Sequence, residues 1–137
     1  LCASDSGSDS KPYRDAGYDV RVITLPEYSV LDYAHQLNHG IISFRSQKVR
    51  HRMSEMIHLK DIYGILAAPP CTMFSLARTT AKTPRDLDTG LELVRACLEI
   101  TWKAKPQFWV MENPKGLLRK FMGKPVFDFD ASEFGEN

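Results

Sequence analysis

Short apolar runs alternate with longer amphipathic stretches along the chain, a pattern that predicts strands alternating with helices. The expected strands are "YDVRVITL" (18–25), "GIISF" (40–44), "IYGILAA" (62–68) and "FWVMEN" (108–113). The expected short helices are "KPYRDAG" (11–17), "LDYAHQL" (31–37), "QKVRHRMSEMIHL" (47–59) and "GLLRKFMG" (116–123).

One longer helix is predicted between the third and fourth of these strands. Thr83 precedes Pro84, and Asp86 follows three residues after Thr83, which is a typical helix start. An apolar face then recurs at helical spacing until Pro106, through Leu87, Leu91, Val94, Leu98 and Thr101. Strands that alternate with helices favour an α/β fold with a mostly parallel sheet and helices on both of its faces.

Composition limits the possible classes of protein. The chain has 137 residues, 43% of them hydrophobic and 26% charged, which suits one globular domain. A net charge of +1 gives no overall attraction to phosphate, so any DNA binding requires a local patch. We expect a cytoplasmic protein, because no apolar run reaches bilayer length and three cysteines do not suggest a disulfide scaffold. The first residues, "LCAS", contain no methionine, and we expect a partial chain.

Residues Leu1 to Ala3 are expected to end a further strand. Three polar clusters follow predicted strands, where parallel sheets hold their ligands. They are "SDSGSDS" (4–10), "PPCTMFS" (69–75) and "ENPKG" (112–116). Two prolines cannot continue a strand, so Cys71 is expected where the backbone leaves the sheet. By position alone, Cys71 is either a nucleophile or an inert thiol, and Glu112 is either an acid or a local hydrogen-bond acceptor. Cys2 and Cys97 have apolar neighbours and are expected in the core.

The combination of motifs resembles the DNA cytosine-5 methyltransferases. "PPCTMFS" resembles their catalytic Pro-Cys motif, and "MENPKG" resembles their Glu-Asn-Val motif in the family order. "LCASDSGSDSKPYRDAGYDV" resembles the glycine-containing motif that holds S-adenosylmethionine, and "ASEFGEN" resembles the start of a later family segment. The resemblance implies a Rossmann-like S-adenosylmethionine-dependent methyltransferase fold. It also implies a single catalytic domain over residues 1–137, similar to compact bacterial and phage members and without the target-recognition region.

The resemblance implies a covalent mechanism on a flipped cytosine. Cys71 would attack C6 and activate C5, while Glu112 would relieve the charge that develops at N3. Asn113 would shape the turn beside Glu112. The expected partner is double-stranded DNA that contains the target cytosine, with no membrane and no metal ion, and the cofactor is S-adenosylmethionine.

Further residues are assigned by the same resemblance to the cofactor and to DNA. Gly7 would let the backbone approach the cofactor, and Glu27 would substitute for the acid that binds ribose. The chain departs from the usual Phe-x-Gly-x-Gly-Gly pattern, because Ala3, Asp5 and Ser8 stand at the positions of Phe and two glycines. The full cofactor set is Ala3, Ser4, Asp5, Ser6, Gly7, Ser8, Glu27 and Pro70. The residues expected to contact DNA are Ser75, Arg78, Lys82 and Arg85.

Two other functions are compatible with parts of the pattern. An amino-group methyltransferase would show Asp/Asn-Pro-Pro-Tyr/Phe, but here Ala68 and Cys71 stand at the outer positions of that motif. A degenerate relative could keep the fold as a binding module without catalysis, an alternative supported by the altered cofactor turn.

Overall fold

The computed structural model describes residues 10–24, 28–37, 40–44, 55–76, 83–130 and 133. Its helices are α1 (Lys11–Asp15), α2 (Val30–Gln36), α3 (Leu87–Ala104) and α4 (Arg119–Met122). Its strands are β1 (Ile41–Phe44), β2 (Glu55–His58), β3 (Gly64–Ala67) and β4 (Phe108–Met111), with a 3₁₀ turn at Leu59–Asp61. The described residues are therefore α/β, as the sequence predicts.

Strand pairing matches the predicted parallel arrangement only in part. β3 and β4 are parallel, with Gly64 opposite Phe108 and Ala67 opposite Met111. β1 and β2 are antiparallel, and the described strands form two separate two-stranded sheets. Residues 18–24 lie outside any helix or strand, so the strand predicted at 18–25 is not present over those residues.

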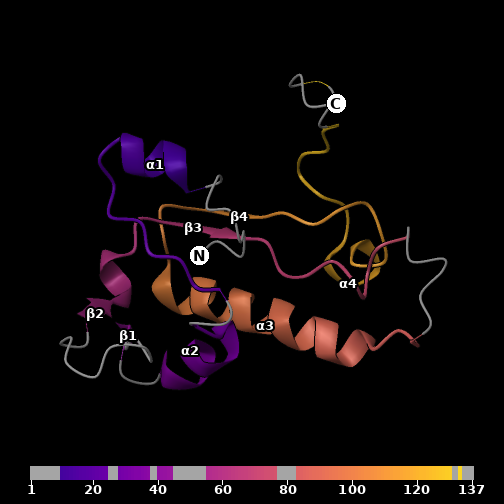
Figure 1. Ribbon diagram of the computed structural model, residues 1–137, viewed down its shortest axis with the longest axis horizontal. Helices are drawn as coiled ribbons and strands as arrows, with labels where there is room; N and C mark the ends of the chain where they lie inside the picture. The colour runs from indigo at the N-terminus through magenta and orange to yellow at the C-terminus, as the bar shows by residue number, and fades with distance from the viewer. Residues whose placement is uncertain are drawn as a thin grey trace.

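Helices cover both faces of the β3–β4 pair (Figure 1). Side chains alternate between the faces of a strand, so Ile65 and Phe108 point in opposite directions. Ile65 is buried in a cluster with Ile100 and Ala104 of α3. On the other face, the Tyr13 ring of α1 stacks with Phe108, at a centroid distance of 6.4 Å.

Two buried clusters make up the core of the described residues. The first cluster joins α2, β1, β3 and the second half of α3, and consists of Ile23, Tyr33, Leu37, Ile42, Leu59, Ile65, Ile100 and Ala104. The second cluster joins the segment after Cys71 to the first half of α3 and the start of α4, and consists of Phe74, Leu91, Val94 and Leu118. Cys97 is also buried, as expected, while Cys2 lies outside the described residues.

The structure corrects the helix predicted over residues 47–59. Residues 55–58 form β2, and Ile57 pairs with Ile42 of β1. Met56 and His58 are exposed whereas Ile57 is half-buried, the two-residue period of a strand. Met53, Met56 and Ile57 are spaced as on one face of a helix, but pairing with β1 makes residues 55–58 a strand. The remaining residues of this prediction, apart from Leu59 in the 3₁₀ turn, lie outside the described ranges.

The long helix is correctly predicted, but its start is not. α3 begins at Leu87 rather than Pro84, because Asp86 is its N-cap and its carboxylate accepts a hydrogen bond from the Thr89 N–H. The predicted apolar face is confirmed, since Leu91, Val94 and Thr101 are all buried. An apolar run such as residues 108–111 predicts a buried strand, yet Trp109 of β4 is 48% exposed.

Candidate active site

The candidate site lies where β3 and β4 end side by side. The Glu112 N–H donates to the Ala67 carbonyl at 2.8 Å, which extends the parallel pairing to the last residues of both strands. Cys71 follows β3 after two prolines and is half-buried, while Glu112 follows β4 directly and is exposed. The parallel register therefore brings the predicted thiol and the predicted acid to one edge of the sheet.

The segment that carries Cys71, here called the Cys71 turn (residues 71–76), is a hydrogen-bonded turn with a buried anchor. The Cys71 carbonyl accepts from the N–H groups of Phe74 and Ser75, both at 2.8 Å. Phe74 is 0% exposed and packs in the second core cluster. Because this ring is fixed in the core, the turn holds the cysteine at a defined place on the rim.

The segment after β4, here called the Glu112 turn (residues 112–118), contacts both the Cys71 turn and Pro69, which lies just before it. The Asn113 side-chain N–H donates to the Pro69 carbonyl at 2.9 Å. Further along, the Leu117 N–H donates to the Phe74 carbonyl at 2.8 Å, and Ser75 forms an antiparallel bridge with Gly116. Asn113 therefore links the segment after β4 to the segment after β3. Its Oδ1 is buried and has no hydrogen-bond partner among the described residues.

The start of α3 supports the same turn from another side. The Arg85 guanidinium donates to the Met73 carbonyl at 3.0 Å. Asp86 accepts from both the hydroxyl and the N–H of Thr89, and these two hydrogen bonds lower the pKa of its carboxyl. Arg85 is exposed, and its guanidinium contacts the Cys71 turn through this hydrogen bond to Met73.

The structure brings together only some of the residues assigned from the sequence. Cys71, Glu112, Asn113, Pro70, Ser75 and Arg85 all lie around the two turns. Pro70 is exposed, and Ser75 is half-buried in the bridge to Gly116. The other assigned residues lie outside the described ranges: Ala3, Ser4, Asp5, Ser6, Gly7, Ser8, Glu27, Arg78 and Lys82.

Sequence reasoning did not identify the contact between Gly116 and the backbone of Phe74. Gly116 belongs to "ENPKG", so a glycine within a predicted site motif was the available signal. A Cβ atom at this glycine would lie 2.3 Å from the Phe74 carbonyl oxygen. The two turns thus approach more closely than any side chain at position 116 permits.

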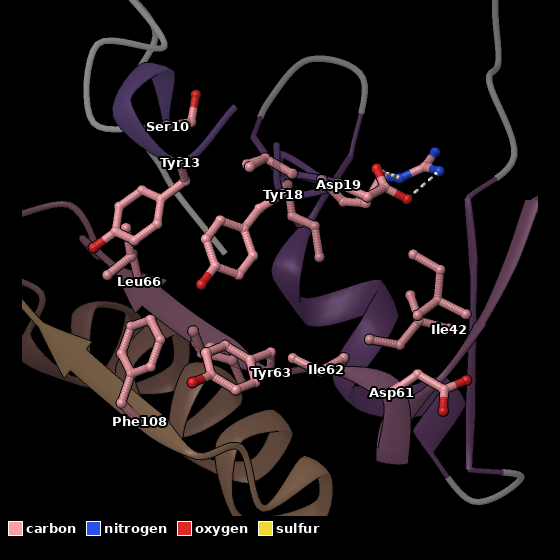
Figure 2. A pocket seen from close by; sticks show the side chains of 16 residues that line it. Ser10, Tyr13, Tyr18, Asp19, Ile42, Asp61, Ile62, Tyr63, Leu66 and Phe108 are labelled. Atoms are coloured by element: carbon pink, nitrogen blue, oxygen red, sulfur yellow. Dashed lines mark hydrogen bonds and ion pairs between the residues drawn. The ribbon is translucent and has the colours of Figure 1, made fainter. Parts of the chain in front are cut away.

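A separate cavity of about 390 Å³ lies beside β3 and the start of β4 (Figure 2). Aromatic rings of Tyr13, Tyr18, Tyr63 and Phe108 line it, and Tyr18 stacks with Tyr63 at a centroid distance of 5.9 Å. Its polar lining includes Asp61 and the paired side chains of Asp19 and Arg21. The described residues that line this cavity do not include Cys71, Glu112 or Asn113.

Within the described ranges, no three His, Cys, Asp or Glu side chains converge as metal ligands. None of the helices found there combines the length and apolarity needed to cross a bilayer.

Comparison with known proteins gives the chain its class. The family model for C-5 cytosine-specific DNA methylases matches residues 31–129, which include both turns. The chain therefore belongs to the C-5 cytosine-specific DNA methylase family. No curated protein and no solved structure matches it.

Proposed function

We propose that this chain transfers a methyl group from S-adenosylmethionine to C5 of a flipped cytosine in double-stranded DNA. The observation that carries the proposal is the common position of Cys71 and Glu112 at the ends of two directly paired strands. Family membership supplies the reaction class, cytosine-5 DNA methylation. In this proposal Cys71 is the nucleophile and Glu112 is the acid, and hydrogen bonds join the segments that carry them.

Cys71 performs the covalent step. Its thiolate sulfur adds to C6, forming an S–C6 bond and moving the ring electrons so that C5 becomes nucleophilic. S-adenosylmethionine, when bound, supplies the methyl group to C5 from its sulfonium sulfur. A base then removes the C5 proton, and the electron pair of that C–H bond restores the C5–C6 double bond and expels the Cys71 sulfur as thiolate.

Glu112 acts on the opposite side of the ring. Addition of sulfur at C6 builds negative charge toward N3, and a hydrogen bond from the Glu112 carboxyl stabilises that charge. Its exposure at the rim leaves it accessible to a base that has left the duplex. Acid assistance of this kind contributes roughly 10²–10⁴-fold to a rate.

The remaining assigned residues complete the proposal. Pro70 is exposed beside Cys71, where it would border both the cofactor and the base. Arg85 would approach DNA phosphate from the start of α3, and Ser75 would contact DNA from the Cys71 turn. Residues 3–8 and Glu27 would hold the cofactor, and Arg78 and Lys82 would contact phosphate; these assignments rest on the resemblance alone.

A covalent trapping experiment tests the mechanism. We expect the chain, incubated with S-adenosylmethionine and duplexes that contain 5-fluorocytosine in random sequence, to form a DNA adduct resistant to denaturation. Fluorine at C5 cannot leave as a proton, so the S–C6 bond persists. Peptide mass spectrometry should locate the adduct at Cys71. Cys71→Ala should abolish the adduct, whereas Cys97→Ala should retain it.

A second comparison isolates the acid. Glu112→Gln should lower the rate of tritium transfer from labelled donor to unmethylated DNA by about 10²-fold or more. Glu92→Gln, an exposed position on α3, is the matched control and should leave the rate unchanged. Adduct formation by Cys71→Ala would refute the mechanism. If the unaltered chain neither forms an adduct nor binds the donor in calorimetry, the binding-module alternative is favoured instead.

A further inference from the structure

Gly116 lies at the closest approach between the two turns of the candidate site. It forms the antiparallel bridge with Ser75, and the next residue, Leu117, donates its N–H to the Phe74 carbonyl at 2.8 Å. These contacts join the segment after Cys71 to the segment after Glu112. The relative position of the two turns therefore depends on how closely their backbones approach at this glycine.

Position 116 has no space for a side chain. A Cβ atom there would lie 2.3 Å from the Phe74 carbonyl oxygen and 3.0 Å from its carbonyl carbon. Both are backbone atoms, which cannot move aside as the end of a flexible side chain can. Gly116 is not among the described residues with positive φ, so close approach rather than backbone conformation requires glycine here.

Phe74 cannot move back to make room. Its ring is 0% exposed and lies against Gly90 of α3, where an added Cβ would be 2.9 Å from the ring Cζ. The neighbouring Met73 carbonyl is held by Arg85 at 3.0 Å. A side chain at position 116 must therefore push the two turns apart or pull the Cys71 turn off its anchor.

We infer that Gly116 is a positioning residue, which sets the separation between the Cys71 turn and the Glu112 turn by allowing backbone contact with Phe74. Its catalytic consequence rests on the proposed function, because a wider separation would move the sulfur away from the acid that assists it. Its structural consequence, a displaced Cys71 turn, does not depend on any reaction.

Thiol alkylation tests the structural consequence without DNA or donor. Gly116→Ala should make Cys71 react with iodoacetamide about tenfold faster, because overpacking strain is relieved by opening the turn. Peptide mass spectrometry resolves Cys71 from the buried Cys97, whose rate should stay at the wild-type value and which reports general unfolding. Lys115→Ala adds no bulk at the contact and is the matched control, with both rates unchanged. An unchanged Cys71 rate in Gly116→Ala would overturn the inference.

A measurement on the unaltered chain covers the case in which Gly116→Ala does not fold. The Leu117 amide should exchange its hydrogen as slowly as the Glu112 amide, which is bonded to Ala67 at the strand end. Exchange of Leu117 at the rate of a free amide would mean that the turns are not joined, and would overturn the inference.

The catalytic consequence is read from steady-state methylation. Gly116→Ala should lower kcat about tenfold while KM for S-adenosylmethionine stays within about twofold, since the change affects placement of the reacting groups rather than donor binding. A rise in KM at unchanged kcat would overturn the catalytic role. If the unaltered chain shows no methylation, the proposed function fails, yet the alkylation and exchange results still decide the positioning role.

Discussion

Replacement of Phe74 by alanine should remove the anchor of the candidate site. The side chain is 0% exposed, and burying a phenylalanine removes roughly 150 Å² from water, worth about 4 kcal/mol at 25 cal/mol per Å². The α3 backbone at Gly90, which the ring touches, offers no side chain to fill the resulting cavity. We therefore expect Phe74→Ala to lower the free energy of unfolding by about 3–5 kcal/mol.

Urea unfolding followed by circular dichroism measures this loss, and the chain provides a matched control. Phe127 is 70% exposed, so Phe127→Ala removes the same ring with little burial and should cost about 1 kcal/mol or less. Equal losses for the two variants would refute the reasoning. Such a result would mean that the burial of Phe74 does not stabilise the fold.

Two other predictions concern stability. Burial raises the pKa of Tyr33 to about 12, with smaller electrostatic contributions from Tyr28 and Asp32. Folding therefore favours the neutral phenol. The stability that this preference supplies is present below about pH 10 and is lost as the pH rises through 12. Relative to Tyr33→Phe, the wild type should lose about 1 kcal/mol of unfolding free energy between pH 8 and pH 11. Urea midpoints of the two proteins that fall in parallel over this range would contradict the prediction. Lys105 is the C-cap that follows α3 and has a φ of 49°, so Lys105→Gly should raise the free energy of unfolding by about 0.5–1 kcal/mol. Glu92→Gly, inside the helix, should lower the free energy of unfolding by about 1 kcal/mol. Thermal unfolding of both variants checks this, and a fall in both would refute it.

The sequence predicted the elements that carry the site because their signals are local. Two consecutive prolines mark the end of β3, and the apolar spacing from Leu87 onward marks the buried face of α3. The residues of both turns could be identified from the sequence because each motif lies at the end of a predicted strand.

The remaining features depend on contacts that sequence patterns do not encode. Residues 55–58 belong to a stretch, 47–59, whose apolar residues have helical spacing, but pairing with β1 makes these four residues a strand. The contact between Gly116 and Phe74 joins residues far apart in the chain, and although Gly116 stands in a site motif, the sequence does not indicate which backbone approaches it. The roles assigned to residues 3–8, Glu27, Arg78 and Lys82 stay predictions, because these residues lie outside the described ranges.

The parallel pairing of β3 with β4 has a consequence for the order in which the site forms. The hydrogen bond between Asn113 and Pro69 spans 44 residues of chain, and closing a loop of that length costs roughly 3 kcal/mol of chain entropy. α3 lies within this loop and can form from local contacts. During synthesis, Cys71 therefore emerges from the ribosome before Glu112, and the candidate site can form only after β4 has emerged and paired with β3.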